Sequence, residues 1–501
     1  ILESYMVEIG RLNREVMPVT PQNTLNPAQE KAFAEIKEAF STKNVALLHG
    51  VTSAGKTEIY IHLIAEALER GEQVLYMLPE IALTKQIVER LRRVFGNRIG
   101  LYHSKFSDAE RVEIWKKQLS DEPYDIILGV RSSVFLPFKN LGLVIVDEEH
   151  ENSYKQQEPA PRYNARNAAI VLASQFSAKT LLGTATPSVE SYYNAVTGKY
   201  ALVSLTTRHR SIKMPHIEVV DMQEHQRRKL VTGAFSDPLV EAMSDALKNG
   251  QQIILFQNRR GYAPLMECKT CGWVPKCKHC DVSLTLHKSA GKLTCHYCGY
   301  TIPAPVHCPN CEERNFINLG YGTEKIEDDL HNLFPEARIE RMDLDTTRTR
   351  NAYEKIITDF QQGKTDILIG TQMVSKGLDF DNVAVVGIIN ADTLMNYPDF
   401  RATERAFQLM AQVAGRAGRK SGQGKVFLQT KMTDAPVIPM IVGNDYAAFY
   451  DQQIGERMLF HYPPFYRLVY IYMKHRDVQV LEEFSTIIGR RMREIFDDRI
   501  L

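Results

Sequence analysis

Residues 45–57 read Val45-Ala-Leu-Leu-His-Gly50-Val-Thr-Ser-Ala-Gly55-Lys56-Thr57, an apolar run that leads into a glycine-containing loop. The loop matches the pattern G-x-x-x-x-G-K-[ST], which requires a strand before it and a helix after it. Both are predicted here, because the run before Gly50 has the character of a short buried strand and a helix pattern begins near Thr57. In this setting, backbone N–H groups and the helix N-terminus bind phosphate oxygens. The stretch therefore predicts an α/β domain that binds a nucleotide.

A second motif, Asp147-Glu148-Glu149-His150, follows the apolar run Leu143 to Val146. An acidic cluster after a strand is commonly a loop or a helix cap. The phosphate loop upstream favours the catalytic interpretation instead. We expect Asp147 to complete the shell of a Mg²⁺ ion and Glu148 to orient or deprotonate the attacking water.

The residues predicted to bind ATP and Mg²⁺ lie in and around the loop. Lys56 is expected to reach the β- and γ-phosphates, and Thr57 to hold the metal. Gln29 can read adenine, because its amide both donates and accepts hydrogen bonds; a surface position on the first helix is the alternative. The full nucleotide-binding set is Gln29, Gly50, Val51, Thr52, Ser53, Ala54, Gly55, Lys56, Thr57 and Asp147.

Later motifs predict further contacts with phosphate. The stretch Gln412-Val-Ala-Gly-Arg416-Ala-Gly-Arg419 places two arginines three residues apart, on one helix face. Planar guanidinium groups suit a phosphoryl transition state, although an arginine-rich helix is more often a salt-bridged surface. Gly370 to Gly377 follows a strand and is expected to contact phosphates. Gly183 to Ser188 is either a link to the γ-phosphate site or a capped turn. The predicted catalytic residues are Lys56, Asp147, Glu148, Gln412, Arg416 and Arg419.

All eight cysteines fall within residues 268–311, as four Cys-x-x-Cys pairs. Thiolate pairs of this spacing suit a tetrahedral metal ion, so the set predicts two structural Cys₄ zinc sites. We expect the two inner pairs to share one ion, because the loop between Cys280 and Cys295 is of zinc-ribbon size. The outer pairs then share the second ion, and sequential pairing is the alternative. The predicted ligands are Cys268, Cys271, Cys277, Cys280, Cys295, Cys298, Cys308 and Cys311.

Short apolar runs alternate with amphipathic helices from Leu25 to about Leu205, and the pattern resumes from Ile253 to Leu428. Such alternation is typical of a parallel α/β sheet. We predict an α/β fold of two RecA-like phosphate-loop lobes, with a double zinc-binding insertion in lobe 2 and the start of a small C-terminal α+β domain that has a strand from Arg467. The predicted parts are an N-terminal segment and linker (1–24), lobe 1 (25–205), a connector (206–236), the first part of lobe 2 (237–267), the zinc module (268–312), the second part of lobe 2 (313–433) and the C-terminal domain (434–501).

Composition limits the classes of function. The chain has 501 residues and a net charge of +1, so nucleic acid must be bound by local basic clusters. The candidates Arg90 to Arg93, Arg227 to Lys229 and Arg259-Arg260 are each otherwise a solvated face. The cysteines suit a reducing compartment, and no apolar run suggests a membrane span. Because the chain starts at Ile1 and its last residues look like an interrupted helix, we expect a fragment.

Together the motifs resemble those of the PriA family, the bacterial primosomal replication-restart DNA helicases of superfamily 2. The resemblance covers nearly the whole chain, and its most specific feature is the four cysteine pairs placed after Asn258-Arg-Arg-Gly-Tyr262. It implies an ATP-dependent 3′-to-5′ helicase that acts at stalled forks and D-loops, with Tyr154 to Arg166 coupling DNA binding to hydrolysis. It also implies a cytoplasmic, nucleoid-associated monomer. Its implied partners are primosome accessory proteins, single-stranded DNA-binding protein and the replicative helicase loader.

Two features depart from the family pattern. The phosphate loop reads Thr52-Ser-Ala-Gly55 where the family usually has Thr-Gly-Ser-Gly, and Ser53 lacks the freedom of glycine at positive φ. We also expect the chain to lack the family's N-terminal domain that captures a 3′ end, and therefore to unwind DNA without fork selectivity. Two other functions stay open: a zinc-stabilised binding module that uses nucleotide as a switch, and a double-strand translocase that does not separate strands.

Overall fold

The chain divides into two compact units. One is formed by Ile1–Arg259, Tyr321–Ala391 and Phe407–Tyr446, and the other by Arg260–Gly320, Asp392–Ala406 and Ala447–Leu501. The computed structural model describes residues 19–52, 54–79, 85–103, 106–207, 215–257, 266–280, 282–287, 291–295, 298–318, 323–343, 346–347, 350–371, 380–418, 424–471 and 473–496. Most of the predicted N-terminal segment, residues 1–18 of 1–24, lies outside the described part of the chain.

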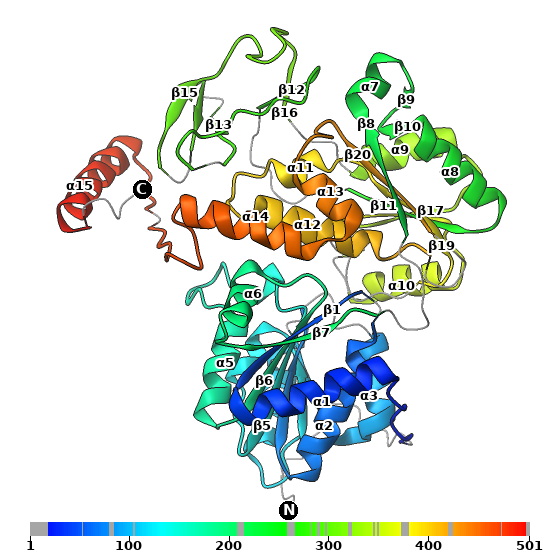
Figure 1. The fold of residues 1–501 in the computed structure, drawn as a ribbon, viewed down its shortest axis with the longest axis vertical. Helices are drawn as coiled ribbons and strands as arrows, with labels where there is room; N and C mark the ends of the chain where they lie inside the picture. The colour runs from blue at the N-terminus through cyan, green and yellow to red at the C-terminus, as the bar shows by residue number, and fades with distance from the viewer. Residues whose placement is uncertain are drawn as a thin grey trace, which may run out of the picture. The chain divides into compact units, whose positions relative to one another are not determined.

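Lobe 1 is built on a seven-stranded sheet in the first unit (Figure 1). The strands run parallel in the order β3-β4-β2-β5-β6-β1-β7. They are β1 (Val45–Gly50), β2 (Gln73–Met77), β3 (Ile99–Tyr102), β4 (Ile126–Gly129), β5 (Leu141–Asp147), β6 (Lys179–Thr184) and β7 (Ala201–Leu205). Five of these strands are predicted by apolar runs and are confirmed, at Val45 to Leu48, Gln73 to Leu78, Ile126 to Leu128, Leu143 to Val146 and Thr180 to Leu182. The two that were missed, β3 and β7, are the edge strands, which are only partly buried and so lack a continuous apolar run.

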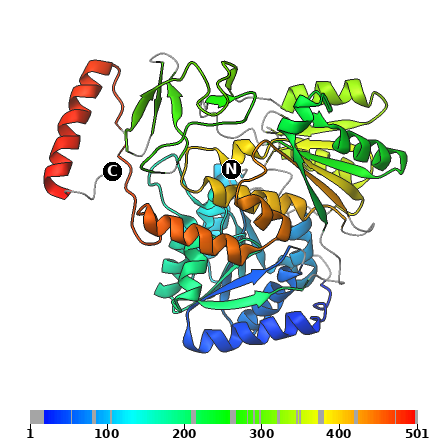
Figure 2. The same ribbon diagram turned by 45° about the horizontal axis from the view of Figure 1, so that its top comes forward.

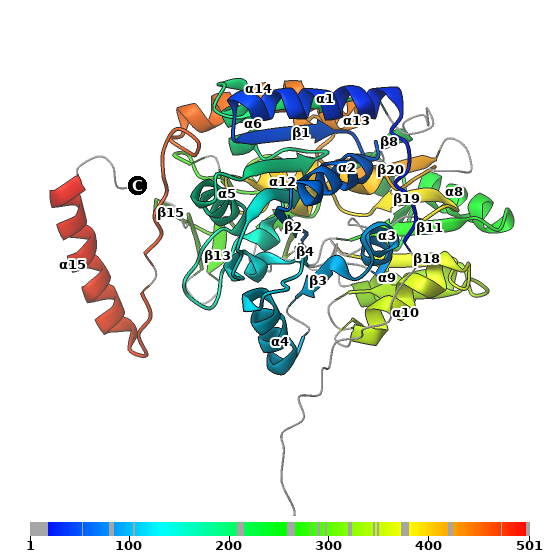
Figure 3. The same cartoon turned by 90° about the horizontal axis from the view of Figure 1, so that it is seen from below.

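Successive side chains of these strands point to opposite faces of the sheet, so one apolar run supplies two cores. Leu48 packs with α1 (Pro27–Thr42), α2 (Lys56–Glu69) and α3 (Lys85–Phe95). Leu47 packs on the other face with α4 (Asp108–Leu119), α5 (Ala165–Gln175) and α6 (Val189–Val196). Figure 3 shows α2 and α3 on one side of the strands and α5 on the other. This double covering explains why the strands read as unbroken apolar runs.

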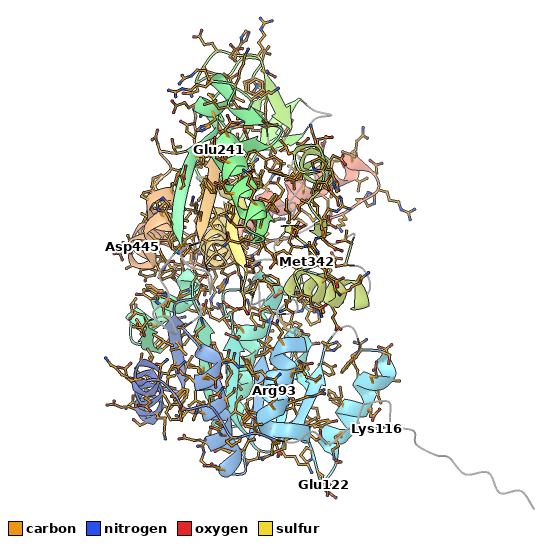
Figure 4. The ribbon with its side chains drawn as sticks, turned by 90° about the vertical axis from the view of Figure 1, so that its right-hand side faces the viewer. Arg93, Lys116, Glu122, Glu241, Met342 and Asp445 are labelled. Atoms are coloured by element: carbon orange, nitrogen blue, oxygen red, sulfur yellow. The ribbon has the colours of Figure 1, made fainter. Side chains whose placement is uncertain are left out.

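Lobe 2 has its own parallel sheet, of six strands in the order β17-β18-β11-β19-β20-β8. The strands are β8 (His216–Asp221), β11 (Gln252–Phe256), β17 (Ile339–Met342), β18 (Ile367–Gly370), β19 (Val383–Ile388) and β20 (Lys425–Thr430). Its helices are α8 (Asp237–Lys248), α9 (Thr323–Leu333), α10 (Arg350–Gln361) and, from Phe407 onward, α12 (Ala402–Ala414). Helix α11 (Asp392–Met395) and the first residues of α12 belong to the second unit. Figure 4 marks Glu241 on α8 and Met342 at the end of β17.

The predicted connector, residues 206–236, differs from the structure. Strand β8 pairs with β20 along its whole length and forms an edge of the lobe 2 sheet. Helix α7 (Met222–Arg227) and the short hairpin of β9 (Val231–Thr232) and β10 (Phe235–Ser236) follow it. Most side chains of β8 are not buried, because it is an edge strand, and this gives it the polar character that suggested a linker. Lobe 2 therefore begins by His216.

The zinc module belongs to the second unit and contains two small antiparallel sheets (Figure 2). Strands β12 (Met266–Cys268) and β16 (Phe316–Asn318) form the first. Strands β13 (Thr285–His287), β14 (Lys292–Thr294) and β15 (Thr301–Pro303) form the second. The described pairing of β12 with β16 extends the module beyond its predicted bounds of 268–312.

Helices α13 (Val437–Gly443), α14 (Tyr446–Leu459) and α15 (Val478–Phe496) make up the end of the chain. The strand predicted from Arg467 does not form, because residues 467–471 have no strand assignment and are largely exposed. An alternating apolar pattern becomes a stable strand only when another strand pairs with it. Across the described residues, no helix combines the length and the hydrophobicity that a membrane crossing requires.

Candidate nucleotide and metal sites

The phosphate loop joins β1 to α2, as predicted. Gly55 is the N-cap of α2 and has a φ of 80°, a left-handed conformation that favours glycine. A Cβ atom there would also lie 2.4 Å from Nε2 of Gln29. Nζ of Lys56 donates to the carbonyl oxygen of Gly50 at 2.8 Å, so the lysine side chain lies along the loop. Two residues depart from the family pattern: Ser53 lies outside the described residues, and Ala54 is buried.

Gln29, on α1, contacts the phosphate loop through its side chain. Its side chain is buried, and Nε2 lies within hydrogen-bond distance of the carbonyl oxygens of Ala54, at 3.3 Å, and Gly55, at 3.2 Å. Its Oε1 accepts from the backbone N–H of Asn26 in a capping box. The surface position offered as an alternative is therefore wrong. Adenine recognition by Gln29 stays a prediction.

Asp147 ends β5, and three groups donate to its carboxylate. Oδ1 accepts from the hydroxyl of Tyr60 at 3.1 Å and from the N–H of Glu148 at 3.1 Å. Oδ2 accepts from the hydroxyl of Tyr76 at 3.3 Å. Burial, and secondarily the charge of Glu148, raises the pKa of Asp147 to about 6. The positive charge of Lys56 acts against this rise.

Predicted catalytic residues from lobe 1 and from lobe 2 come into contact at Glu148. Nε2 of Gln412, on α12, donates to Oε2 of Glu148 at 3.3 Å and lies 3.0 Å from Nε2 of His150. Nδ1 of His150 in turn lies 2.7 Å from the hydroxyl of Thr184. One amide nitrogen of lobe 2 thus contacts two residues of the acidic motif.

Arg416 is buried in a turn just beyond the end of α12, so the prediction that it lies on a helix face is wrong. Glu148 lies close enough to influence its charge. Burial lowers the pKa of Arg416 to about 10, and the charge of Glu148 opposes that change. A Cβ atom on Gly415 would lie 3.0 Å from the side chain of Thr52, so this segment approaches the phosphate loop closely. Arg419 and residues 372–377 lie outside the described part of the chain, and their roles stay predictions.

Glu149 has a structural role that the sequence did not reveal. Its buried carboxylate accepts four hydrogen bonds: from Arg166 Nη1 at 2.6 Å, from the N–H and Oγ of Ser188 at 2.7 and 3.0 Å, and from Oγ of Ser191 at 2.8 Å. Ser188 is also the N-cap of α6. The stretch Gly183–Ser188 therefore ends in a capped turn, which was the structural alternative. Its link to a γ-phosphate is not tested.

Two of the three predicted basic clusters contain arginines that form ion pairs, and the third lies outside the described residues. Arg90 pairs with Glu58, and Arg228 pairs with Glu224 at 2.5 Å, as expected of a solvated face. Arg259-Arg260 and the rest of residues 258–262 lie outside the described part of the chain. No cluster among the described residues therefore carries an assignment to nucleic acid by itself.

The eight cysteines form two separate groups, with sulfur atoms within 4.8 Å of one another in each. Cys268, Cys271, Cys308 and Cys311 form the outer group, and Cys277, Cys280, Cys295 and Cys298 the inner one. The nested pairing is confirmed and the sequential pairing is wrong. Sulfur–sulfur distances of 3.5 to 3.6 Å are close to the ~3.8 Å edge of a tetrahedron with Zn–S bonds of about 2.3 Å. The donor set therefore fits zinc.

The local sequence explains how the two cysteines of each Cys-x-x-Cys pair come together. In three of them the residue after the second cysteine donates its N–H to the carbonyl oxygen of the first cysteine. These residues are Gly272, Gly299 and Glu312, with φ angles of 73°, 75° and 62°. Two of the three are glycine, the residue that adopts this conformation most readily. The turn thus points both sulfur atoms toward one ion.

Family models match the two lobes and the module between them. A DEAD/DEAH box helicase model matches residues 26–195, a helicase conserved C-terminal domain model matches residues 312–421, and the model of the PriA DNA helicase Cys-rich region matches residues 277–303. Among solved structures, the chain is similar to RecG bound to a three-way DNA junction, with a TM-score of 0.50 and 17% identity over 86% of this chain and 47% of that one. The helicase MrfA bound to DNA gives a TM-score of 0.50 at 15% identity, over 85% of this chain and 51% of that one. Fold and site together define a two-lobed helicase.

Curated relatives narrow the class to one family. The chain is 42% identical to the replication restart protein PriA of Bacillus subtilis, over 93% of this chain and 57% of that protein. It is 40% identical to the same protein of Rickettsia felis, over 97% of this chain and 77% of that protein. The chain therefore belongs to the family of replication restart protein PriA. It spans somewhat more than half the length of the Bacillus subtilis relative.

Proposed function

We propose that this chain is the motor of an ATP-dependent 3′-to-5′ DNA helicase that acts at stalled or collapsed forks and D-loops to restart replication. The observation that best supports this proposal is the contact of Gln412 with Glu148 and His150, which joins lobe 2 to the acidic motif of lobe 1. A nucleotide on the phosphate loop would lie where both lobes contribute side chains. Closure and opening of the two lobes around it would then convert hydrolysis into movement along a strand.

Each predicted site residue has a place in this proposal. Lys56 and Thr57 would hold the phosphates and Mg²⁺ together with Asp147, and Glu148 would orient the attacking water. Mg²⁺ would neutralise charge that develops on the phosphate oxygens. Arg416, whose charge Glu148 already influences, would complement that charge from lobe 2, as would Arg419.

The wider role is proposed from the family. We propose that the chain binds forks, D-loops and single-stranded DNA as a monomer in the bacterial cytoplasm, at the nucleoid. Its proposed partners are primosome accessory proteins, single-stranded DNA-binding protein and the loader of the replicative helicase. The two zinc groups would hold the module in its folded form and not take part in hydrolysis, because all four positions around each ion are thiolates.

The test is ATP hydrolysis with and without single-stranded DNA, with Lys56→Ala as the blank. We expect strong stimulation by DNA in the unmodified chain and none in the variant. A strand-displacement assay with substrates of both polarities follows. DNA-stimulated hydrolysis without strand separation would support a double-strand translocase. ATP binding without any hydrolysis would support a nucleotide-switched binding module.

A further inference from the structure

Two buried tyrosines lie beside Asp147, and no predicted role accounts for them. Tyr60 projects from α2 and Tyr76 from β2, and neither side chain is exposed. Their rings pack edge to face, with centroids 5.7 Å apart and an angle of 78° between the planes. Phenylalanine would fill this space equally well, so the hydroxyl groups need an explanation of their own.

Both hydroxyls donate to the same carboxylate. Tyr60 contacts Oδ1 of Asp147 and Tyr76 contacts Oδ2, while the N–H of Glu148 also donates to Oδ1. A carboxylate has about four acceptor positions, two on each oxygen. Both positions on Oδ1 are therefore used, and one position on Oδ2 is left. The three hydrogen bonds restrict rotation of the carboxylate, and they leave Oδ2 as the oxygen that can still accept a further partner.

The neighbouring strand accommodates this arrangement. Gly183 of β6 lies opposite Asp147 in the sheet. A Cβ atom on Gly183 would lie 1.8 Å from the hydroxyl oxygen of Tyr60 and 2.8 Å from Cζ, distances that no side chain tolerates. The hydroxyl occupies the space that any larger residue at position 183 would need. Tyr60, which belongs to α2, thus lies next to both the acidic motif and strand β6.

We propose that Tyr60 and Tyr76 are positioning residues that hold the Asp147 carboxylate so that Oδ2 faces the divalent cation bound with nucleotide at the phosphate loop. This inference rests on the proposed function, because it assumes a cation at this site. The tyrosines do not touch the nucleotide. They act through Asp147, whose carboxylate would otherwise rotate about its Cβ–Cγ bond and lose its preorganised direction.

The test measures how much Mg²⁺ the protein needs to bind a fluorescent ADP analogue, N-methylanthraniloyl-ADP. Tyr60→Phe and Tyr76→Phe each remove one hydroxyl and keep the ring. We expect the Mg²⁺ concentration at half-saturation to rise about tenfold or more in each, the usual effect of losing one hydrogen bond to a charged group. Tyr102→Phe is the matched control, because Tyr102 lies on edge strand β3, three strands away from β5.

A second variant tests the same geometry from the other side. Gly183→Ala leaves both hydroxyls in the chain but forces Tyr60 away from Asp147, so it should weaken Mg²⁺-dependent binding as Tyr60→Phe does. Thermal unfolding followed by circular dichroism shows whether each variant is folded. If Tyr60→Phe does not fold, the Mg²⁺ requirement of Tyr76→Phe alone provides the test.

The outcomes separate this inference from the function on which it rests. Mg²⁺-dependent binding in the unmodified protein, together with a Mg²⁺ requirement in Tyr60→Phe and Tyr76→Phe equal to that of Tyr102→Phe, overturns the positioning role alone. Absence of Mg²⁺-dependent binding in the unmodified protein overturns the proposed nucleotide site and the inference with it. Selective weakening in the two variants supports both.

Discussion

The buried ion pair between Arg166 and Glu149 allows a stability prediction worked directly from the structure. The side chain of Glu149 has no exposed surface, and that of Arg166 is 14% exposed. Removing one partner of a buried pair costs about 3 to 5 kcal/mol, because the other charge stays buried without it. Three further donors, from Ser188 and Ser191, still contact Glu149 when the arginine is gone. We therefore expect Arg166→Met to lower the unfolding free energy of lobe 1 by about 3 kcal/mol.

The tryptophans make a selective assay possible. The chain has two, Trp115 on α4 of lobe 1 and Trp273 in the zinc module. In a Trp273→Phe background, urea unfolding followed by tryptophan fluorescence therefore reports on lobe 1. With a urea slope of about 2 to 3 kcal/mol per molar, the predicted loss moves the midpoint down by about 1 to 1.5 M.

The control uses Arg162, an exposed arginine that lies shortly before α5, the helix that carries Arg166. Arg162 pairs with Glu158 at 3.7 Å, and these side chains are 49% and 74% exposed. Such a pair contributes less than about 1 kcal/mol, so Arg162→Met should move the midpoint little. The double variant Arg166→Met/Glu149→Met should recover part of the loss, because no unpaired charge is left. Equal shifts in Arg166→Met and Arg162→Met would refute this reasoning.

Three further predictions concern the sites themselves. Glu148→Gln should reduce DNA-stimulated ATP hydrolysis by about a hundredfold or more while ATP still binds; unchanged phosphate release would remove Glu148 from the catalytic set. Cys277→Ser should lower the zinc content measured by atomic emission from about two ions per chain to about one, since the outer group is separate; a full complement would contradict the assignment of Cys277 as a zinc ligand. Because the pKa of Asp147 is raised to about 6, its carboxyl takes up a proton as the pH falls through that value, so Mg²⁺-dependent nucleotide binding should weaken there. Asp147→Asn should bind Mg²⁺ weakly at every pH, and an unmodified protein with the same Mg²⁺ requirement on both sides of pH 6 would contradict this assignment.

The sequence predicted the features that depend on short, local patterns. The phosphate loop, the acidic motif and the central strands of both sheets were found because parallel strands covered on both faces read as apolar runs. The nested zinc groups were favoured from the spacing of Cys280 and Cys295. Each of these depends on a few consecutive residues or on one spacing.

The features that the sequence missed depend on contacts between distant segments. Strand β8 looks polar, and only its pairing with β20 makes it part of lobe 2. Glu149 looked like one more acidic residue of a catalytic motif, yet its partners Arg166, Ser188 and Ser191 turn it inward. Tyr60 follows the phosphate loop in an ordinary helix pattern, and its hydroxyl gains meaning only when β5 and β6 lie beside it.

The two ends of the zinc module lie side by side in the strand pair β12 and β16. The chain enters and leaves the module through β12 and β16, where Cys268 lies opposite Phe316, and the outer cysteines at both ends come together there. An insertion whose two ends already meet adds no strain to the parallel sheet that it interrupts. An ion held by the four outer cysteines would therefore close the module at the point where the chain enters and leaves it. The module is not independent of the rest of its unit, because Phe400 packs against the core of the inner cysteine group and the hydroxyl of Tyr462 donates to the carbonyl oxygen of Cys280. A protein engineer who replaced the module with a short turn would therefore also have to redesign these contacts.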